Sequence, residues 1–160
     1  MQLTLLRHAK SSWQGNKRDH ERPLNARGRR DAPIMAQRLK DRNYVPDKLY
    51  FSSAKRTHET ATIFADILGM ETSNSLVSVD SLYLASVESL FATIAEAIQH
   101  NVAHLMVVGH NPGLEDLAIS LDPASPEHLP TCAICHYQLT KPMDARLVFV
   151  DYPKLAISHQ

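Results

Sequence analysis

LMVVGHNP, residues 105–112, decides the fold class. Its four apolar residues predict a buried strand over Leu105–Val108 that ends at Gly109 and His110. Asn111 is a good N-cap and Pro112 suits a first helical position, so a helix is predicted to follow at once. A buried strand that leads directly into a helix is the repeating unit of α/β folds.

The same alternation extends in both directions along the chain. Residues 8–24 are predicted to form a loop, and a proline-rich loop is expected before residue 131. Other predicted strands lie at Gln2–Leu6, Lys48–Phe51, Leu76–Val79, 131–139 and 146–151. Three other helices are predicted. The first begins after Asn25 and ends near Asn43, the second spans 55–68 with Gly69 as its stop signal, and the third begins after Ser86. The last two strands have no helix between them, which predicts at least one antiparallel pair.

These elements predict an α/β three-layer sandwich, with a mostly parallel central sheet and helices on both faces. The chain has 160 residues, of which 44% are hydrophobic and 21% charged, an ordinary globular composition. We therefore expect a single domain over residues 1–160. No apolar run is long enough to cross a membrane, and MQLTLLRHAK at the start has no secretory h-region. We therefore expect the protein to be cytoplasmic and not to bind membranes.

Charge is unevenly distributed although the net charge is zero. Residues 1–60 contain 14 Lys and Arg against 6 Asp and Glu, whereas residues 61–160 contain 3 against 11. This asymmetry favours an anionic ligand or partner for the first part of the chain. A zero net charge argues against general nucleic-acid binding, which needs a basic footprint.

Basic and imidazole side chains follow three of the predicted strands. Arg7 and His8 end the first strand, Arg56 comes shortly after the second, and His110 follows Leu105–Val108. Ligands of open α/β sheets bind at the carboxyl ends of the strands, so these groups should meet at one edge. Two guanidinium groups, two imidazoles and a helix start predict an anion site, most simply a phosphate site.

LLRHAKSSW at residues 5–13 resembles the Arg-His-Gly phosphate-pocket motif of the histidine phosphatase superfamily, also called phosphoglycerate mutase-like. The Arg-His-Ala-Lys-Ser-Ser-Trp form is similar to its small phosphohistidine phosphatase branch, the SixA family. Further similar segments follow in the order of that branch, namely RPL at 22–24 with Gly28 and Asp31, SSAKR at 52–56 with Thr60, and VGHNP at 108–112.

The resemblance implies a role for each residue of the expected phosphate site. His8 would be the nucleophile that forms a covalent phosphohistidine, and Arg7 and Arg56 would hold the phosphoryl oxygens. His110 would donate to the same oxygens. Further donors could come from the loop after the nucleophile, from Ser11, Ser12 and Gln14. The resemblance implies no metal ion and no cofactor.

The chain departs from the superfamily pattern where many members carry a carboxylate general acid after the third strand. That stretch reads SLYLAS at 81–86, and the nearby Glu88 is either a substitute donor or a solvated residue of a helix start. An alkoxide leaving group needs protonation, whereas an imidazole leaves easily. The missing acid therefore favours phosphohistidine over phosphate esters.

The implied function is a phosphohistidine phosphatase. Its substrate would be a histidine-phosphorylated protein, either a phosphorelay HPt domain or a phosphotransferase-system carrier, and inorganic phosphate would be released. A monomer is expected. Two alternatives stay open, a small-molecule phosphomonoesterase or mutase of the same superfamily, and a non-catalytic phosphate-binding module.

Several other features have two interpretations. Trp13 lines the mouth of the site or anchors its loop on the core. Lys17, Arg18, Arg27, Arg29 and Arg30 form a docking surface for an acidic phosphoprotein or a solvated face. CAICH at 132–136 matches a haem-attachment pattern, but it falls within a predicted strand, so two buried core cysteines are predicted. The remaining histidines are predicted at the surface or at sheet edges, namely His20, His58, His100, His104, His128, His136 and His159.

Overall fold

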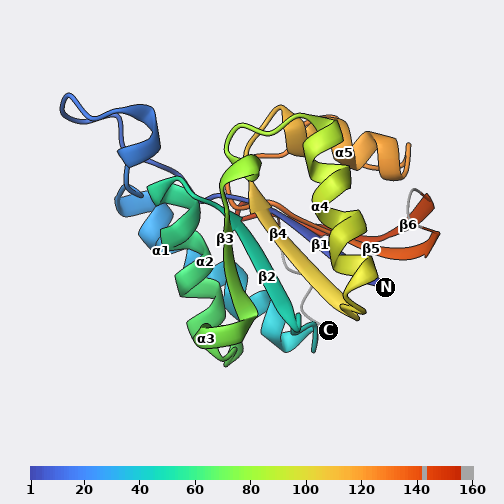
Figure 1. Ribbon diagram of the computed structural model, residues 1–160. Helices are drawn as coiled ribbons and strands as arrows, with labels where there is room; N and C mark the ends of the chain where they lie inside the picture. The colour runs from blue at the N-terminus through green and yellow to red at the C-terminus, as the bar shows by residue number, and fades with distance from the viewer. Residues whose placement is uncertain (142–143, 156–160) are drawn as a thin grey trace.

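A six-stranded sheet forms the centre of the computed structural model, which describes residues 1–141 and 144–155 (Figure 1). The strands follow the spatial order β3-β2-β4-β1-β5-β6. Their bounds are Gln2–Arg7 for β1, Lys48–Ser52 for β2, Leu76–Val79 for β3, His104–Gly109 for β4, Ile134–Lys141 for β5 and Asp144–Asp151 for β6. The first four strands run parallel, β5 is antiparallel to β1, and β6 is antiparallel to β5. The predicted mostly parallel sheet with an antiparallel pair is confirmed.

Helices cover both faces of this sheet (Figure 1). They are α1 at Ala26–Asp41, α2 at Lys55–Leu68, the short α3 at Thr72–Ser75, α4 at Val87–Gln99 and α5 at Gly113–Leu121. Two short 3-10 turns, Asp19–Glu21 and Asp80–Leu82, precede α1 and α4. Within the described residues, no helix combines the length and the apolar character that a membrane crossing needs.

The side chains of β4 show how the sheet supports two hydrophobic cores. Leu105 and Val107 join the core under α4 and α5, whereas Met106 and Val108 join the core under α1 and α2. Successive side chains of a strand point to opposite faces, so a fully apolar run suits a strand that is covered on both sides. All six residues of β4 are buried. The predicted three-layer architecture is confirmed.

Predicted helix boundaries agree with the structure at three positions. The Asn25 side chain accepts a hydrogen bond of 2.9 Å from the Gly28 amide, and Ser86 accepts one of 3.3 Å from the Ser89 amide. Gly69 ends α2 with a positive φ of 72°. Gly28 also lets α1 approach the loop after β1, because a Cβ there would lie 2.1 Å from the Lys10 carbonyl oxygen. The loop that follows His8 is thereby held against α1.

Several element boundaries differ from the prediction, and two of them lie close to the ends of the strands that precede His8 and His110. Helix α5 begins at Gly113, with Pro112 at its N-cap position and a cis Asn111-Pro112 bond. The Asn111 side chain does not cap the helix; it donates a 2.9 Å hydrogen bond to the Leu129 carbonyl. Cys132 lies outside β5, because its φ of 63° is not extended and its amide donates to the carbonyls of Arg7 and His8.

Two histidines predicted at the surface or sheet edges are buried instead, and that prediction is wrong for them. His104 is 6% exposed and His136 is 1% exposed. The Thr4 hydroxyl lies 2.7 Å from His104 Nε2 and 2.8 Å from His136 Nδ1. Thr4 belongs to β1, which lies between β4 and β5, so its hydroxyl satisfies both rings inside the sheet layer. His159 lies outside the described residues.

Candidate active site

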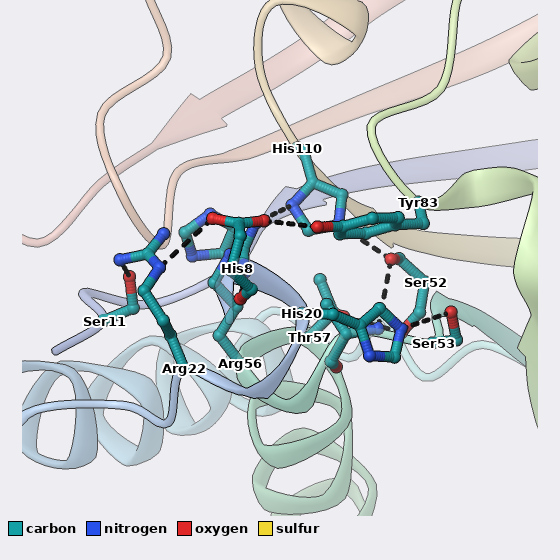
Figure 2. A network of polar contacts seen from close by, with 12 residues as sticks. His8, Ser11, His20, Arg22, Ser52, Ser53, Arg56, Thr57, Tyr83 and His110 are labelled. Atoms are coloured by element: carbon teal, nitrogen blue, oxygen red, sulfur yellow. Dashed lines mark hydrogen bonds and ion pairs between the residues drawn. The ribbon is translucent and has the colours of Figure 1, made fainter. Parts of the chain in front are cut away.

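A pocket of about 250 Å³ lies at the carboxyl ends of β1 and β4. Arg7 pairs with Gly109 across these two strands, which brings the next residues, His8 and His110, together. The centroids of the two imidazole rings are 5.4 Å apart. The pocket lining includes Arg7, His8, Arg56 and His110, and Figure 2 shows three of them from close by. The four residues that the sequence analysis singled out therefore meet in one cavity.

One ring nitrogen of the His8 imidazole makes a hydrogen bond, and the other carries no proton. His8 Nδ1 lies 2.7 Å from the Ala9 carbonyl oxygen, which can only accept, so Nδ1 carries the hydrogen. The lone pair then resides on Nε2. Burial lowers the pKa of His8 to about 3, and His110, Arg56 and Arg7 act in the same direction. A neutral imidazole with a free Nε2 can act as a nucleophile.

His110 is held between a guanidinium and a hydroxyl (Figure 2). Arg56 Nη2 donates to His110 Nδ1 over 3.3 Å, so the ring hydrogen resides on Nε2, which donates to Ser52 Oγ over 2.7 Å. Burial and then the charge of Arg56 lower the pKa of His110 to about 4. The ring is therefore neutral at physiological pH in this arrangement.

The two arginines differ in how they are anchored. Arg56 lies in the first turn of α2 and is 2% exposed. Its Nη1 donates to the Asp19 carbonyl over 2.7 Å and its Nη2 to the Asp19 carboxylate over 3.0 Å. Arg7 Nη1 donates to the Leu129 carbonyl over 2.9 Å. The Nε atoms of both arginines are buried and have no hydrogen-bond partner among the described residues.

Three residues that the sequence analysis did not assign to the site surround this group. Asp19 Oδ1 accepts a 3.2 Å hydrogen bond from Arg22 Nε, and Asp19 Oδ2 accepts one of 2.5 Å from the Tyr83 hydroxyl. Burial opposes ionisation of Asp19, but the hydrogen bonds from Tyr83 and Arg56 outweigh it and lower the pKa to about 2. Asp19 is therefore a carboxylate at neutral pH.

The signals for these three residues were weak. Asp19 and Arg22 share a single turn inside a stretch without hydrophobic periodicity, and Arg22 was noted only within the RPL segment. Tyr83 lies inside SLYLAS, the stretch where many members of the superfamily carry a carboxylate. Ser52 was likewise noted only as part of a motif, although its hydroxyl contacts His110.

The remaining candidate donors lie in different places. Ser11 lines the pocket, and its hydroxyl accepts a 2.9 Å hydrogen bond from Arg22 Nη1. Ser12 and Gln14 line a neighbouring groove and are not part of the pocket lining. Glu88 is exposed in the first turn of α4 and is also absent from the pocket lining. Trp13 lines the pocket and is 75% exposed, which rules out its packing on the core as a loop anchor.

The cysteines and the metal-ligating side chains give no second site. Cys132 and Cys135 are free and buried, and they belong to the cores on opposite faces of the sheet. Burial raises the pKa of both thiols, to about 11 for Cys135. In the part of the chain that the structure describes, three or more His, Cys, Asp or Glu side chains do not gather around a potential metal position.

Comparison with known proteins places the chain in a family. Residues 3–76 match the model of the histidine phosphatase superfamily, branch 1. The candidate phosphohistidine phosphatase SixA from Agrobacterium tumefaciens is 30% identical, and the alignment covers 95% of this chain and 97% of that one with a TM-score of 0.83. The chain belongs to the SixA-type branch of the histidine phosphatase superfamily.

Two further similar proteins extend the comparison. The protein histidine phosphatase SixA complexed with tungstate shares the fold, with a TM-score of 0.86 at 22% identity over 96% of this chain and 97% of that one. A chloroplastic protein of Arabidopsis thaliana is 36% identical over 137 residues. That alignment covers 81% of this chain but 62% of the plant protein, so the chain spans less than two thirds of the length of that relative.

Proposed function

We propose that the chain is a phosphohistidine phosphatase that dephosphorylates a histidine-phosphorylated protein, such as a phosphorelay HPt domain or a phosphotransferase-system carrier. The observation that carries this proposal is the neutral His8 imidazole, which has a free Nε2 and lines a pocket together with two guanidinium groups. The likeness to the candidate phosphohistidine phosphatase SixA of A. tumefaciens supports the same substrate class.

In the first step, His8 Nε2 attacks the phosphorus, and the bond from phosphorus to the substrate imidazole breaks. Arg7 and Arg56 hold the phosphoryl oxygens and balance the charge that develops on them. Phosphoryl oxygens are acceptors that could satisfy the buried Nε–H groups of both arginines. His110, once protonated or in its other tautomer, donates from Nδ1 to the same group.

The leaving group must depart without a carboxylic acid from the pocket. Asp19 is the only carboxylate among the residues that line it, and its pKa of about 2 keeps it ionised. An alkoxide leaves poorly under these conditions because it is a strong base. A phosphohistidine that carries a proton on its second ring nitrogen releases a neutral imidazole, so this pocket favours phosphohistidine over phosphate esters.

In the second step, water attacks the phosphorus of phosphorylated His8, and the bond from phosphorus to Nε2 breaks. The proton of the attacking water ends on the phosphate oxygens. Inorganic phosphate leaves, and His8 returns to its neutral form. The Ala9 carbonyl keeps the proton of His8 on Nδ1 throughout both steps, so Nε2 alone exchanges the phosphoryl group.

A substrate panel tests this proposal. Purified protein is given a histidine-phosphorylated carrier protein, free phosphohistidine, a sugar phosphate and an aryl phosphate, and phosphate release is measured. We expect rapid release from the phosphohistidine substrates, an acid-labile phosphoryl label on His8, and loss of turnover in His8→Ala with phosphate affinity partly retained. Efficient cleavage of the esters alone would indicate the phosphomonoesterase alternative. Phosphate binding without labelling or release would indicate the binding module.

A further inference from the structure

A groove larger than the phosphate pocket lies directly beside it. Its volume is about 810 Å³, and Lys10, Ser11 and Trp13 line both cavities, which places them side by side. The groove lies between the loop that follows β1 and the first turns of α1. Figure 1 shows this loop projecting from the body of the protein at upper left. A molecule seated in the pocket would therefore extend naturally into the groove.

Positive charge dominates the groove. Its lining includes Lys10, Lys17, Arg27 and Arg29, all of them exposed, and no Asp or Glu. Arg27 has an ion pair with Asp31 at 3.4 Å, and no carboxylate of the described residues lies within ion-pair distance of the other three. These cations lie outside the lining of the phosphate pocket except for Lys10. They form an attractive surface for carboxylates that surround a phosphorylated side chain.

Trp13 gives this surface a fixed aromatic contact. Its side chain is 75% exposed, yet the Arg22 guanidinium carbon lies 3.5 Å from the centroid of its ring. Arg22 is itself 7% exposed and is anchored by Ser11 and Asp19 inside the phosphate pocket. An exposed indole that is already ordered loses little conformational entropy on binding, and tryptophan is enriched among the residues that dominate interface energies.

We propose that this groove, with Trp13 at its junction with the pocket, is the docking surface for an acidic face of the phosphoprotein, next to its phosphorylated histidine. The proposal rests on the proposed function. The phosphoryl group occupies the pocket, the carboxylates of the partner contact Lys17 and Arg27, and an apolar partner side chain packs on Trp13. A small phosphorylated molecule would fill the pocket and leave the groove unoccupied.

Charge reversal in the groove tests this assignment. The double variant Lys17→Glu/Arg27→Glu removes two groove cations that have no part in the proposed chemistry. We measure kcat and KM with an acidic, histidine-phosphorylated carrier protein and with free phosphohistidine. We expect kcat/KM for the phosphoprotein to fall at least tenfold, chiefly through KM, and kcat/KM for free phosphohistidine to stay within twofold.

A matched control separates the docking effect from a general change of charge. Lys40→Glu/Arg146→Glu makes the same charge change at two exposed residues outside the groove and should leave both substrates within twofold of the wild type. Equal losses for the two substrates in the groove variant, or a loss no larger than that of the control, would overturn the docking surface while leaving the proposed function intact. A wild type that hydrolyses neither phosphohistidine substrate would overturn both.

The single tryptophan supplies a second readout that needs no turnover. Addition of the unphosphorylated carrier to the wild type should change the Trp13 fluorescence with saturation, and the midpoint should rise as salt is added. The charge-reversed variant should bind at least tenfold more weakly. An unchanged midpoint in that variant would contradict the proposal even if its kinetics were altered.

Discussion

Arg56 Nη2 lies 3.0 Å from the carboxylate of Asp19, so an arginine proposed to receive the phosphoryl group already contacts an anion. The same carboxylate accepts hydrogen bonds from Arg22 and Tyr83, and its pKa of about 2 keeps it charged. A bound phosphate must therefore share Arg56 with Asp19 or displace it. Asp19 is therefore expected to oppose anion binding, although it also orders Arg56, Arg22 and Tyr83.

Replacing Asp19 by Asn should tighten the binding of inorganic phosphate. The variant removes a negative charge that competes for Arg56, and the Asp19 side chain is 40% exposed, so we expect a decrease in Kd of about fivefold, equivalent to about 1 kcal/mol. Isothermal titration calorimetry measures the Kd of each variant for inorganic phosphate. Asp66→Asn makes the same charge change at an exposed residue of α2 and should leave Kd unchanged. Weaker binding in Asp19→Asn would mean that Asp19 mainly positions Arg56.

Ser52→Ala should slow turnover without weakening substrate binding in proportion. Ser52 accepts the Nε2 hydrogen of His110, and loss of the Ser52 hydroxyl leaves a buried donor without a partner, which disfavours the protonated ring that donates from Nδ1. We expect kcat to fall about tenfold, KM to stay within about threefold, and the pH profile to shift. Ser53→Ala removes the neighbouring hydroxyl, which contacts His20 instead, and serves as the control. An unshifted profile would exclude the positioning role.

His8 should remain neutral far below the ordinary range of histidine. Its pKa is about 3 in the folded protein because the ring is buried beside cations, against 6.5 for a free side chain. Nitrogen chemical shifts of the labelled imidazole should therefore show one tautomer, with the hydrogen on Nδ1, from pH 8 to pH 5. The ring of the exposed His100 is recorded in the same spectra for comparison. A titration midpoint of the His8 ring above pH 5.5 would contradict the prediction.

Acid should destabilise the protein through His104 and His136. Both are buried, and burial lowers the pKa of each to about 4, against 6.5 when unfolded. Between these values the unfolded chain binds more protons, so the stability present above pH 6.5 is lost as the pH falls toward 4. Urea denaturation should show a decrease of about 1–2 kcal/mol per histidine between pH 7 and pH 5.

Variants identify the histidines responsible for this acid sensitivity. His8 and His110 contribute in the same direction because their pKa values are also lowered. The double variant His104→Gln/His136→Gln should therefore lose part of the pH dependence, whereas His100→Gln, at an exposed position, should retain all of it. If the stability of the double variant depended on pH as steeply as that of the wild type, His104 and His136 would not be the source of the acid sensitivity.

Features that depend on local sequence were predictable. The apolar run at 105–108, the Asn25 and Ser86 caps and the Gly69 stop each depend on neighbouring residues, and the structure confirms them. The meeting of His8 with His110 followed from the rule that parallel strands end at one edge.

Features that depend on contacts between distant segments were not predictable. His104 and His136 look like surface residues until Thr4 is placed between them. Asp19 and Tyr83 are 64 positions apart, and nothing in the sequence near either residue indicates that they form a hydrogen bond. The loop from 8 to 24 has no periodicity, so its path over the pocket came from the three-dimensional structure alone.

The central place of β1 has a consequence for biosynthesis. β1 leaves the ribosome before the other described strands, yet its two neighbours in the sheet are β4 and β5. Thr4 of β1 therefore contacts His104, a residue that is synthesised 100 positions later. Nascent chains that end before β4 therefore expose an unpaired apolar strand, a situation that invites chaperone binding or aggregation. Since His8 meets His110 only after β4 has docked, the pocket that these two residues line should form late in folding.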